Sequence, residues 1–470
     1  MHPFEKYQQD WSRRTFLKQS FAGLGGLAMS KLMAAEALPF LQSQGGLHLP
    51  AKAKRVVHLC MAGGPSHLES FDPKPVLDQL NGQPFPESFT AGQQLAQLQG
   101  AKLIARGSFT KFRKWGACGT EISELFPHIG SIADDICVVR SMVTEQINHD
   151  PAHAFMNSGS ILKGRPSMGS WLLYGLGAES QDLPGYVVMV SRGVEADQPI
   201  SARQWSAGFL PSKFQGVQFQ SKGSAVHYVG NPDGICQSTQ RQVIDEVRRM
   251  NGLLGEERLD PEIDTRISQY EMAFRMQASV PELTDMRNEP QHVLDMYGVK
   301  QPGDGSFASN CLLARRMLER GVRFVQLYHR GWDHHGGIEK KMPATALLTD
   351  QASAALVKDL KQRGMLEDTL VIWGGEFGRT PMGQGTGRDH HIRAFSIWMA
   401  GAGIKPGIVH GATDDLGYNS EKDIVQVRDL HATMLHQFGI DHARFSTKFQ
   451  GLDYKLTGVK PASVVKGILA

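Results

Sequence analysis

The chain has 470 residues, and its 50 Lys and Arg against 47 Asp and Glu give a formal net charge of +3. A balance this even argues against a nucleic-acid partner and against an anionic membrane surface. Hydrophobic residues make up 41% of the sequence and charged residues 21%, which is typical of globular proteins, so we expect one large domain with insertions.

The N-terminus predicts an export signal over residues 1–37. The sequence Ser-Arg-Arg-Thr-Phe-Leu-Lys at 12–18 resembles a twin-arginine motif, and an apolar stretch rich in Gly and Ala follows at 20–33. Small residues at 34–37 suit cleavage, and the apolar run is too short to span a bilayer. We therefore expect the twin-arginine translocase as a partner, a periplasmic or extracellular location, and no stable membrane insertion after processing. A chance Arg pair ahead of an amphipathic helix is the alternative.

After a lead-in segment at 38–54, we expect a single domain over residues 55–470. Its first predicted buried strands lie at 55–62, 135–140 and 185–190. An insertion is expected at about 190–300. It contains two predicted amphipathic helices, at 238–254 and 261–277.

The C-terminal third alternates helices and strands. The predicted order is helix 307–320, strand 322–328, helix 344–363, strand 369–374, strand 395–400 and helix 429–438. Such alternation is typical of an α/β fold in which helices cover both faces of a parallel sheet.

Acidic and imidazole side chains follow the strands of this alternation. Asp333 and His335 stand two positions apart directly after a strand, so both can point to one side of an extended loop. Glu376 lies among glycines after the next strand, and Arg379 close by can pair with an anionic substrate or with Glu376. Because an open α/β sheet gathers its ligands at the carboxyl ends of its strands, these side chains predict a divalent-metal site.

Two further clusters add imidazoles. Asp389 and His390 lie in a Gly-rich stretch, 383–393, which we expect to be a loop leading into the last strand. We expect one of its histidines to be a metal ligand, the alternative being a solvated pair that caps a turn. His149 and His153 follow the strand at 135–140 and are expected to form a wall of the site. His67 follows the first strand in the same manner.

Several motifs together resemble those of domain-of-unknown-function family 1501 (DUF1501). They are Gly-Gly-Pro-Ser-His at 63–67, Phe-Asp-Pro-Lys-Pro at 71–75, Gly-Trp-Asp-His-His at 331–335, Gly-Glu-Phe-Gly-Arg-Thr-Pro at 375–381 and Asp-Leu-His-Ala-Thr at 429–433. The resemblance covers nearly everything after the signal. It implies the alkaline phosphatase and sulfatase fold, a three-layer αβα sandwich with a mostly parallel central sheet and inserted loops and helices.

The resemblance also implies a hydrolase that binds one or two divalent metals and cleaves phosphate or sulfate esters. Among the motifs that carry the resemblance, it matches Glu376 and the Asp389-His390 pair to metal-binding positions. Together with the residues argued above, the candidate metal ligands are Asp333, His335, Glu376, His390, Asp389 and His67. Where relatives in the superfamily place acidic ligands after the first strand, this chain has Gly63 and Gly64. Ser66, His67 or Asp72 must then substitute, or the site holds one ion.

The catalytic motif departs from that of sulfatases. The Cys-x-Pro-x-Arg motif corresponds to the run from His149 to His153, His-Asp-Pro-Ala-His, so no formylglycine precursor is present. His149 or His153 would act as a covalent nucleophile or as a base that activates a metal-bound water, and Arg379 would clamp the anion.

The leading hypothesis is an exported, metal-dependent hydrolase of sulfate or phosphate esters, carried by small molecules or polysaccharides. The alternative is a non-catalytic metal- or glycan-binding member of the same fold. An oxidoreductase is disfavoured, because no GxGxxG follows a strand and the five cysteines form no cluster. The ligand types favour Zn²⁺ or Mn²⁺, with Ca²⁺ as an alternative where carboxylates dominate.

Overall fold

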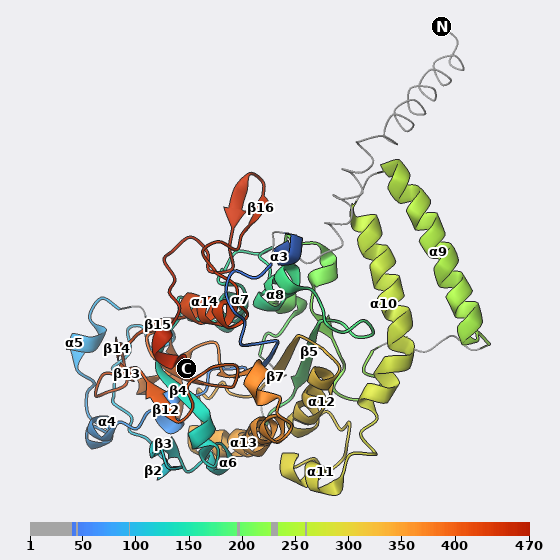
Figure 1. The fold of residues 1–470 in the computed structure, drawn as a ribbon. Coiled ribbons are helices and arrows are strands. Elements are labelled where there is room, and N and C mark those ends of the chain that lie inside the picture. The colour runs from blue at the N-terminus through green and yellow to red at the C-terminus, as the bar shows by residue number, and fades with distance from the viewer. Residues whose placement is uncertain (1–39, 44–45, 94, 195–197, 227–233, 259–260) are drawn as a thin grey trace, which may run out of the picture.

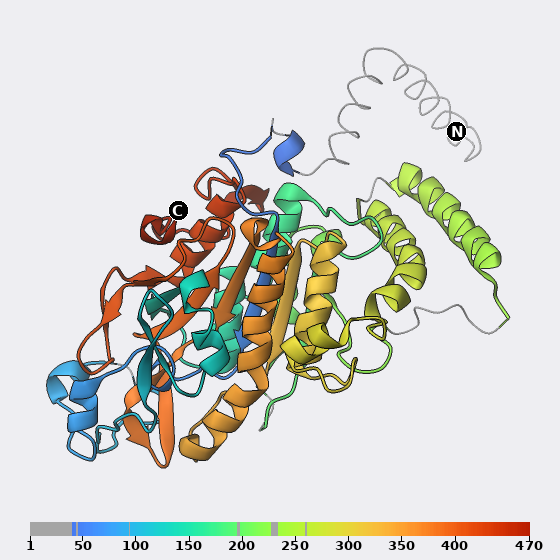
Figure 2. The same ribbon diagram turned by 60° about the horizontal axis from the view of Figure 1, so that its bottom comes forward.

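The computed structural model of the chain describes residues 40–43, 46–93, 95–194, 198–226, 234–258 and 261–470. The predicted signal at 1–37 lies outside these residues. The described part is built on a central sheet with helices on both faces (Figures 1 and 2). Among the described helices, none is both long and apolar enough to cross a membrane.

The central sheet has nine strands in the order β12-β4-β11-β8-β1-β7-β5-β6, with β15 beside β4. The strands are β1 (Arg55–Met61), β4 (Ile136–Val143), β5 (Tyr186–Ser191), β6 (Val217–Gln218), β7 (Phe324–His329), β8 (Thr369–Gly374), β11 (Phe395–Ala400), β12 (Ile408–His410) and β15 (Val425–Gln426). All neighbours pair in parallel except β11, which is antiparallel to β4 and β8. The predicted, mostly parallel sheet is confirmed.

Alternating side chains along the strands feed two separate cores. On β1, Val57, Leu59 and Met61 enter one core, while Val56 and Cys60 enter the other, as the two-residue period of a strand requires. The first core is covered by α6 (Pro127–Gly130), α11 (Gln291–Tyr297), α12 (Phe307–Glu319) and α13 (Ile338–Gln362). The second core is covered by α3 (Phe40–Ser43), α7 (His149–Ser158), α8 (Met168–Leu176) and α14 (Val427–Gln437). The fold is therefore the predicted three-layer αβα sandwich.

The segment between β5 and α12 contains the predicted insertion. It includes α9 (Gln237–Arg258) and α10 (Pro261–Thr284), which pack on each other and project from the body of the molecule, at the right of Figure 1. The same segment supplies β6 to the central sheet, so it also completes the core fold.

Short elements decorate the sandwich. They are α4 (Pro75–Gln79), α5 (Glu87–Thr90), and the strand pairs β2 (Phe112–Trp115) with β3 (Thr120–Ser123), β13 (Ala412–Thr413) with β14 (Ser420–Lys422), and β16 (Thr447–Phe449) with β17 (Leu452–Tyr454). All five cysteines lie in the described part of the chain and are unpaired.

The Gly-rich stretch at 383–393 was expected to be a loop, and this prediction is wrong. It forms most of an antiparallel hairpin of β9 (Gly378–Gln384) and β10 (Gly387–His391). Arg388 of this hairpin is fully buried and pairs with the equally buried Glu69. Its guanidinium also donates to the carbonyls of Arg106 and Thr380. These contacts come from distant parts of the chain, so the local sequence pattern does not reveal the hairpin.

Strand direction determines which loops meet. Strands β4, β8, β1 and β7 run in the same direction, so their carboxyl ends lie at one edge of the sheet. Because β11 runs the other way, the segment that precedes it reaches that same edge. The residues after four strands and before a fifth are therefore brought together.

Candidate metal centre

Four of the predicted site residues converge at this edge. Asp333 and His335 follow β7, His390 lies in β10 just ahead of β11, and His149 is the first residue of α7, after β4. Each offers one ligand-type atom, and these atoms lie within 4.8 Å of one another. A second such group joins His149 to His153 and Glu376. Six of the nine predicted residues thus form one cluster, in which His149 is shared.

Three atoms of the first group form a tight triangle. His335 Nε2 lies 3.0 Å and His390 Nε2 lies 3.3 Å from Asp333 Oδ1. The two imidazole Nε2 atoms are 2.9 Å apart. Tetrahedral ligands at the Zn–N distance of about 2.0–2.1 Å stand roughly 3.3 Å from one another. The triangle therefore has nearly the size that a coordinated ion requires.

The partners behind the two imidazoles fix their tautomers. His335 Nδ1 donates to Gln384 Oε1, and His390 Nδ1 donates to the carbonyl of Ile147 at 2.7 Å. Burial is the largest influence on His390 and lowers its pKa, which favours the neutral ring. A neutral imidazole that donates from Nδ1 has only a lone pair on Nε2. Two imidazole lone pairs and a carboxylate oxygen thus face one another, and a cation would relieve their repulsion.

The second group is buried more deeply. His149 Nδ1 lies 2.7 Å from Glu376 Oε1, and its Nε2 lies 3.1 Å from Asp333 Oδ2, so this ring stands between the two carboxylates. His153 Nε2 is 3.4 Å from Glu376 Oε1. The side chains of His153 and Glu376 are fully buried, and neither ring nitrogen of His153 has a hydrogen-bond partner within the described residues. Its Nε2 is therefore available as a ligand.

Electrostatics keep both carboxylates charged. Burial opposes the charge of Glu376, but His153 and His149 outweigh it and lower its pKa to about 2. Burial likewise opposes the charge of Asp333, but its polar contacts with His149, His335 and His390, together with the charge of Arg379, hold its pKa well below its usual range. For His149, burial lowers the pKa, but the bonds to Asp333 and Glu376 outweigh it and raise it to about 9. At neutral pH the two carboxylates of the site are therefore ionised and face the cations of His149 and Arg379.

Arg379 lies beneath the cluster rather than in its opening. Its side chain is only 1% exposed. Its guanidinium donates to Asp333 Oδ1 at 2.6 Å, and to the carbonyls of Gly64, Gly63 and Arg388. These bonds occupy its donors, so the structure gives Arg379 the task of holding Asp333, in place of the anion clamp expected from sequence.

The structure does not bring His67 or Asp389 into the cluster. His67 Nε2 bonds to the carbonyl of Gly417 at 2.9 Å. Asp389 is fully buried and accepts the backbone N–H groups of Leu98 and His390, both at 2.8 Å. Asp389 therefore ties the hairpin to the segment that covers it. Asp72, another candidate after β1, is also outside both ligand groups and pairs with Lys74 at 3.1 Å. The Ser66 hydroxyl is buried and has no hydrogen-bond partner within the described residues.

Gly63, at the end of β1, allows the site loops to meet. Its φ is +122°, and a Cβ there would lie 2.4 Å from the backbone nitrogen of Asp333. Its N–H donates to both oxygens of Glu376, at 3.0 and 3.2 Å. A glycine replaces the expected acidic ligand because the backbone itself occupies that space.

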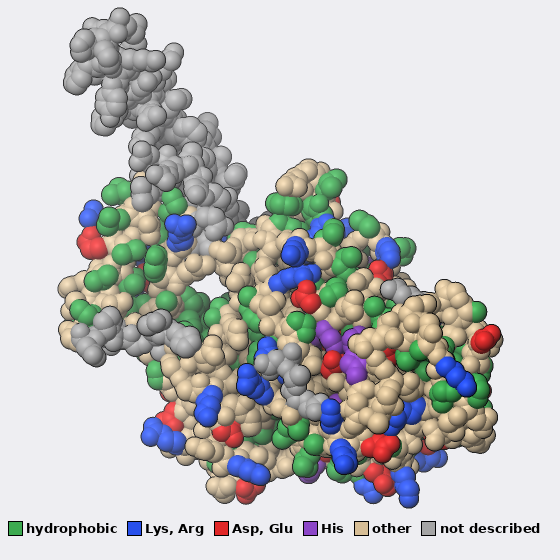
Figure 3. Space-filling view, turned by 180° about the vertical axis from the view of Figure 1, so that it is seen from behind, with side chains coloured by type: hydrophobic (Ala, Val, Ile, Leu, Met, Phe, Trp, Pro, Cys, Tyr) green, Lys and Arg blue, Asp and Glu red, His purple; other side chains and the backbone are tan. Residues whose placement is uncertain are grey.

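The cluster is accessible from solvent. The side chains of Asp333 and His335 are each 25% exposed, and that of His149 is 13% exposed. Figure 3 shows a group of histidine side chains, with acidic atoms beside them, in a hollow near the middle of one face. A substrate could therefore approach the first group directly, while the second lies deeper.

Sequence reasoning missed the residues that hold the ligands in place. Gln384 and the carbonyl of Ile147 fix the imidazoles, yet neither carries a recognisable pattern. One signal was available for the second group. His149 and His153 stand four positions apart, which places both on one face of a helix.

Several solved structures of sulfatases and of the alkaline phosphatase superfamily are similar to this chain. The PsFucS1 sulfatase from Pseudoalteromonas sp. is 15% identical, with 88% of this chain and 71% of that chain covered and a TM-score of 0.33. The phosphonate monoester hydrolase SpPMH from Silicibacter pomeroyi is 12% identical, with 67% and 68% covered and a TM-score of 0.30. Ps i-CgsB in complex with k-i-k-neocarrahexaose is 9% identical, with 83% and 72% covered and a TM-score of 0.35.

Curated protein sequences contain no match to the chain. The family model described as "Protein of unknown function (DUF1501)" matches residues 53–469, which is nearly all of the described structure. The sequence motifs that resembled this family include the loops that carry Asp333 and Glu376. The chain therefore belongs to the DUF1501 family.

Proposed function

We propose that this protein is a metal-dependent hydrolase of phosphate or sulfate esters, exported by the twin-arginine route. The observation that carries the proposal is the triangle of Asp333 Oδ1, His335 Nε2 and His390 Nε2, whose sides measure 2.9 to 3.3 Å. Two imidazoles whose Nδ1 atoms donate to other groups, with Nε2 aimed at one carboxylate oxygen, are a ligand set that suits Zn²⁺ or Mn²⁺, with Ca²⁺ as the alternative.

A divalent ion supplies two effects when bound: it lowers the pKa of water toward about 7, and it offsets negative charge on the ester oxygens. In the proposal, Asp333, His335 and His390 would hold this ion. Its charge would offset the carboxylates that raise the pKa of His149, so that the neutral ring could act as the base toward the attacking water. Glu376 holds the His149 ring through Nδ1. Arg379 keeps Asp333 in place. His153, Glu376 and His149 would instead hold a second ion if two are bound.

A binding protein of the same fold is the second candidate. Within the described residues, the two ligand groups include no cysteine thiol, and the run from His149 to His153 contains no formylglycine precursor. A metal or glycan could be held there without turnover. Turnover therefore decides between the two candidates.

The test begins with metal analysis of the protein isolated from its export route. Wild-type protein should contain Zn²⁺ or Mn²⁺ at one or two equivalents. The Asp333→Ala variant should lose the ion at the first group, while Asp415→Ala, at an exposed aspartate, should keep it. Stoichiometric metal in Asp333→Ala would defeat the ligand assignment.

Activity is then measured on aryl phosphates and aryl sulfates with added Zn²⁺, Mn²⁺ or Ca²⁺. The hydrolase proposal expects turnover that falls at least about a hundredfold in His149→Gln, as is usual for loss of a general base. Wild-type protein that binds metal but hydrolyses none of these esters would favour the binding role.

A further inference from the structure

A cavity of about 230 Å³ lies at the C-terminal end of α7, opposite the end that carries His149. Because α7 has 10 residues, its axis spans about 15 Å between the metal centre and this cavity. Glu145, which lines the cavity, lies four residues before His149. The cavity and the metal centre therefore share one continuous segment of chain.

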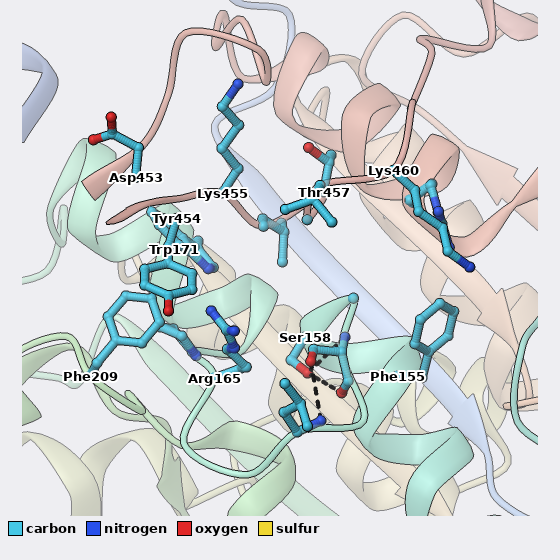
Figure 4. A pocket seen from close by; sticks show the side chains of 18 of the residues that line it. Phe155, Ser158, Arg165, Trp171, Phe209, Asp453, Tyr454, Lys455, Thr457 and Lys460 are labelled. Carbon is cyan, nitrogen blue, oxygen red and sulfur yellow. Dashed lines mark hydrogen bonds between the residues drawn. The ribbon is translucent and has the colours of Figure 1, made fainter. Parts of the chain in front are cut away.

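One wall of the cavity is aromatic. Phe209 and Tyr454 lie with their ring centroids 5.1 Å apart, and the Arg165 guanidinium stands 4.0 Å from the centroid of the Tyr454 ring. Figure 4 shows these three side chains grouped at one side of the cavity. Phe209 also stacks on Phe449, with ring centroids 4.9 Å apart, and both Phe209 and Tyr454 stay half-buried, so part of each ring remains as apolar surface. The C–H face of a sugar ring is a suitable partner for such a surface.

The rest of the lining is basic. Arg165, Arg428, Lys455 and Lys460 line the cavity, against Glu145 and Asp453, so its net charge is positive. Glu145 accepts ion pairs from both Arg428 and Lys460.

Arg428 still has a donor to offer. Its side chain is 6% exposed, and its Nε–H has no hydrogen-bond partner within the described residues. A buried guanidinium donor without a partner is costly, and sulfate or carboxylate oxygens match its geometry.

We propose that this cavity binds an anionic sugar unit of a polysaccharide whose ester is hydrolysed at the metal centre. The inference rests on the proposed function and narrows its substrate class from esters in general to acidic polysaccharides. Tyr454 and Phe209 stack on the sugar ring. Arg165 and Lys455 pair with its sulfate or carboxylate group, and a more distant unit of the same polysaccharide reaches the metal centre.

Calorimetric binding to hexasaccharides tests this directly. The probes are sulfated hexasaccharides from carrageenan and chondroitin sulfate, a polygalacturonate hexasaccharide, and the desulfated carrageenan hexasaccharide as the neutral counterpart. We expect at least one anionic probe to bind about tenfold or more tightly than the neutral one. Equal binding of charged and neutral probes, or binding of none, would overturn the inference.

Variants locate the binding. Arg165→Gln, Tyr454→Leu and Lys455→Gln should each weaken the anionic probe about tenfold, the usual effect of losing one charge-assisted or stacking contact. Lys163→Gln, at an exposed lysine outside the cavity lining, should bind like wild type. Thermal unfolding of each variant checks folding, and Lys455→Gln alters only a half-exposed side chain. Variants that fold and bind like wild type would contradict the assignment.

The Asp333→Ala variant separates this inference from the proposed function. It should bind the hexasaccharide as wild type does, because the cavity lies outside the ligand groups. If the protein binds the hexasaccharide but contains no metal and shows no turnover, the proposed function is contradicted, while the assignment of the cavity as an anionic-sugar site is supported. If the protein hydrolyses aryl esters in a metal-dependent way but the cavity variants bind the hexasaccharide like wild type, only this inference is contradicted.

Discussion

The chemistry of each imidazole in the cluster depends on which of its nitrogens carries the proton. His335 and His390 each donate from Nδ1, to Gln384 and to the carbonyl of Ile147. This leaves both Nε2 atoms as lone-pair donors toward the ion. Groups behind the ligands therefore set the metal affinity as much as the ligands themselves.

Replacing Gln384 tests this arrangement. Gln384→Leu should lower the affinity for Zn²⁺ about 10–100-fold, because the His335 ring loses the acceptor that fixes its tautomer. Competition with a chelating dye measures the affinity. Gln83→Leu, at an exposed glutamine far along the chain, is the control. Equal affinities in the two variants would show that Gln384 does not orient the ring.

Replacing Arg379 tests whether its guanidinium supports the site. Arg379→Met removes the guanidinium that donates to the Asp333 carboxylate and to three backbone carbonyls, so the free energy of unfolding should fall by about 3–5 kcal/mol. Urea denaturation measures it. Arg320→Met removes a solvent-exposed pair with Glu282 and should cost under about 1 kcal/mol. A loss no larger than that of the control would mean that Arg379 does not support the site.

Among the secondary-structure elements, β1 ends where the loops that follow β7 and β8 pack against it. Gly63 has a backbone conformation that other residues rarely adopt, and the loop after β7 leaves no room for a Cβ. Its N–H also holds Glu376. The packing of three loops thus depends on one glycine.

Two glycine substitutions separate the free-energy cost of the backbone conformation from the cost of a steric clash. Gly63→Ala should cost about 1–2 kcal/mol for its backbone conformation, and more for the clash with Asp333 N, while also reducing bound metal. Gly82 has a φ of +80° and open space around it, so Gly82→Ala should show only the conformational cost. Urea denaturation and metal analysis report both effects. Equal losses in the two variants would argue against tight packing at Gly63.

The direction of strand β11 could not be read from the sequence. Strand β11 follows hydrophobic patterning and was located correctly, but its antiparallel pairing was not visible in its residues. That direction is what brings His390 to the metal centre. The hairpin before it is held by buried contacts such as Arg388 with Glu69, which are far apart in sequence.

Across the whole molecule, several histidines are buried in neutral form. Burial lowers the pKa of His58 and of His329 to about 3, and that of His431 to about 4. In the unfolded chain each would titrate near 6.5. Below that pH these histidines bind protons in the unfolded state but not in the folded state. Their contribution to the free energy of unfolding is therefore fully present above about pH 6.5 and is lost as the pH falls toward 3–4.

The expected slope is steep. Each such histidine contributes about 1.4 kcal/mol per pH unit below about pH 6, so the three together contribute about 4 kcal/mol per unit. Urea unfolding at pH 7.5, 6.0 and 5.0 measures the slope. His329→Phe should reduce it by about 1.4 kcal/mol per pH unit. No ring nitrogen of His329 has a hydrogen-bond partner among the described residues, so the substitution orphans no group. An unchanged slope would contradict the assignment.

The sequence by itself determined the strands, the layers and the family. Continuous apolar runs located the major strands of the sheet, because strands buried on both faces need apolar side chains throughout. The position of Asp333, His335 and Glu376 after such runs was enough to predict a site at the strand ends. Residue types alone could do this because the carboxyl ends of parallel strands share one edge.

Only the tertiary structure decided which side chains meet. His67 and Asp389 carry the right chemistry, yet the carbonyl of Gly417 holds Nε2 of His67, and the N–H groups of Leu98 and His390 occupy both oxygens of Asp389. Arg379 turned inward to Asp333. Whether a side chain reaches an ion depends on contacts between segments hundreds of residues apart, and on the direction in which each strand enters the sheet. No local pattern in the sequence records either one.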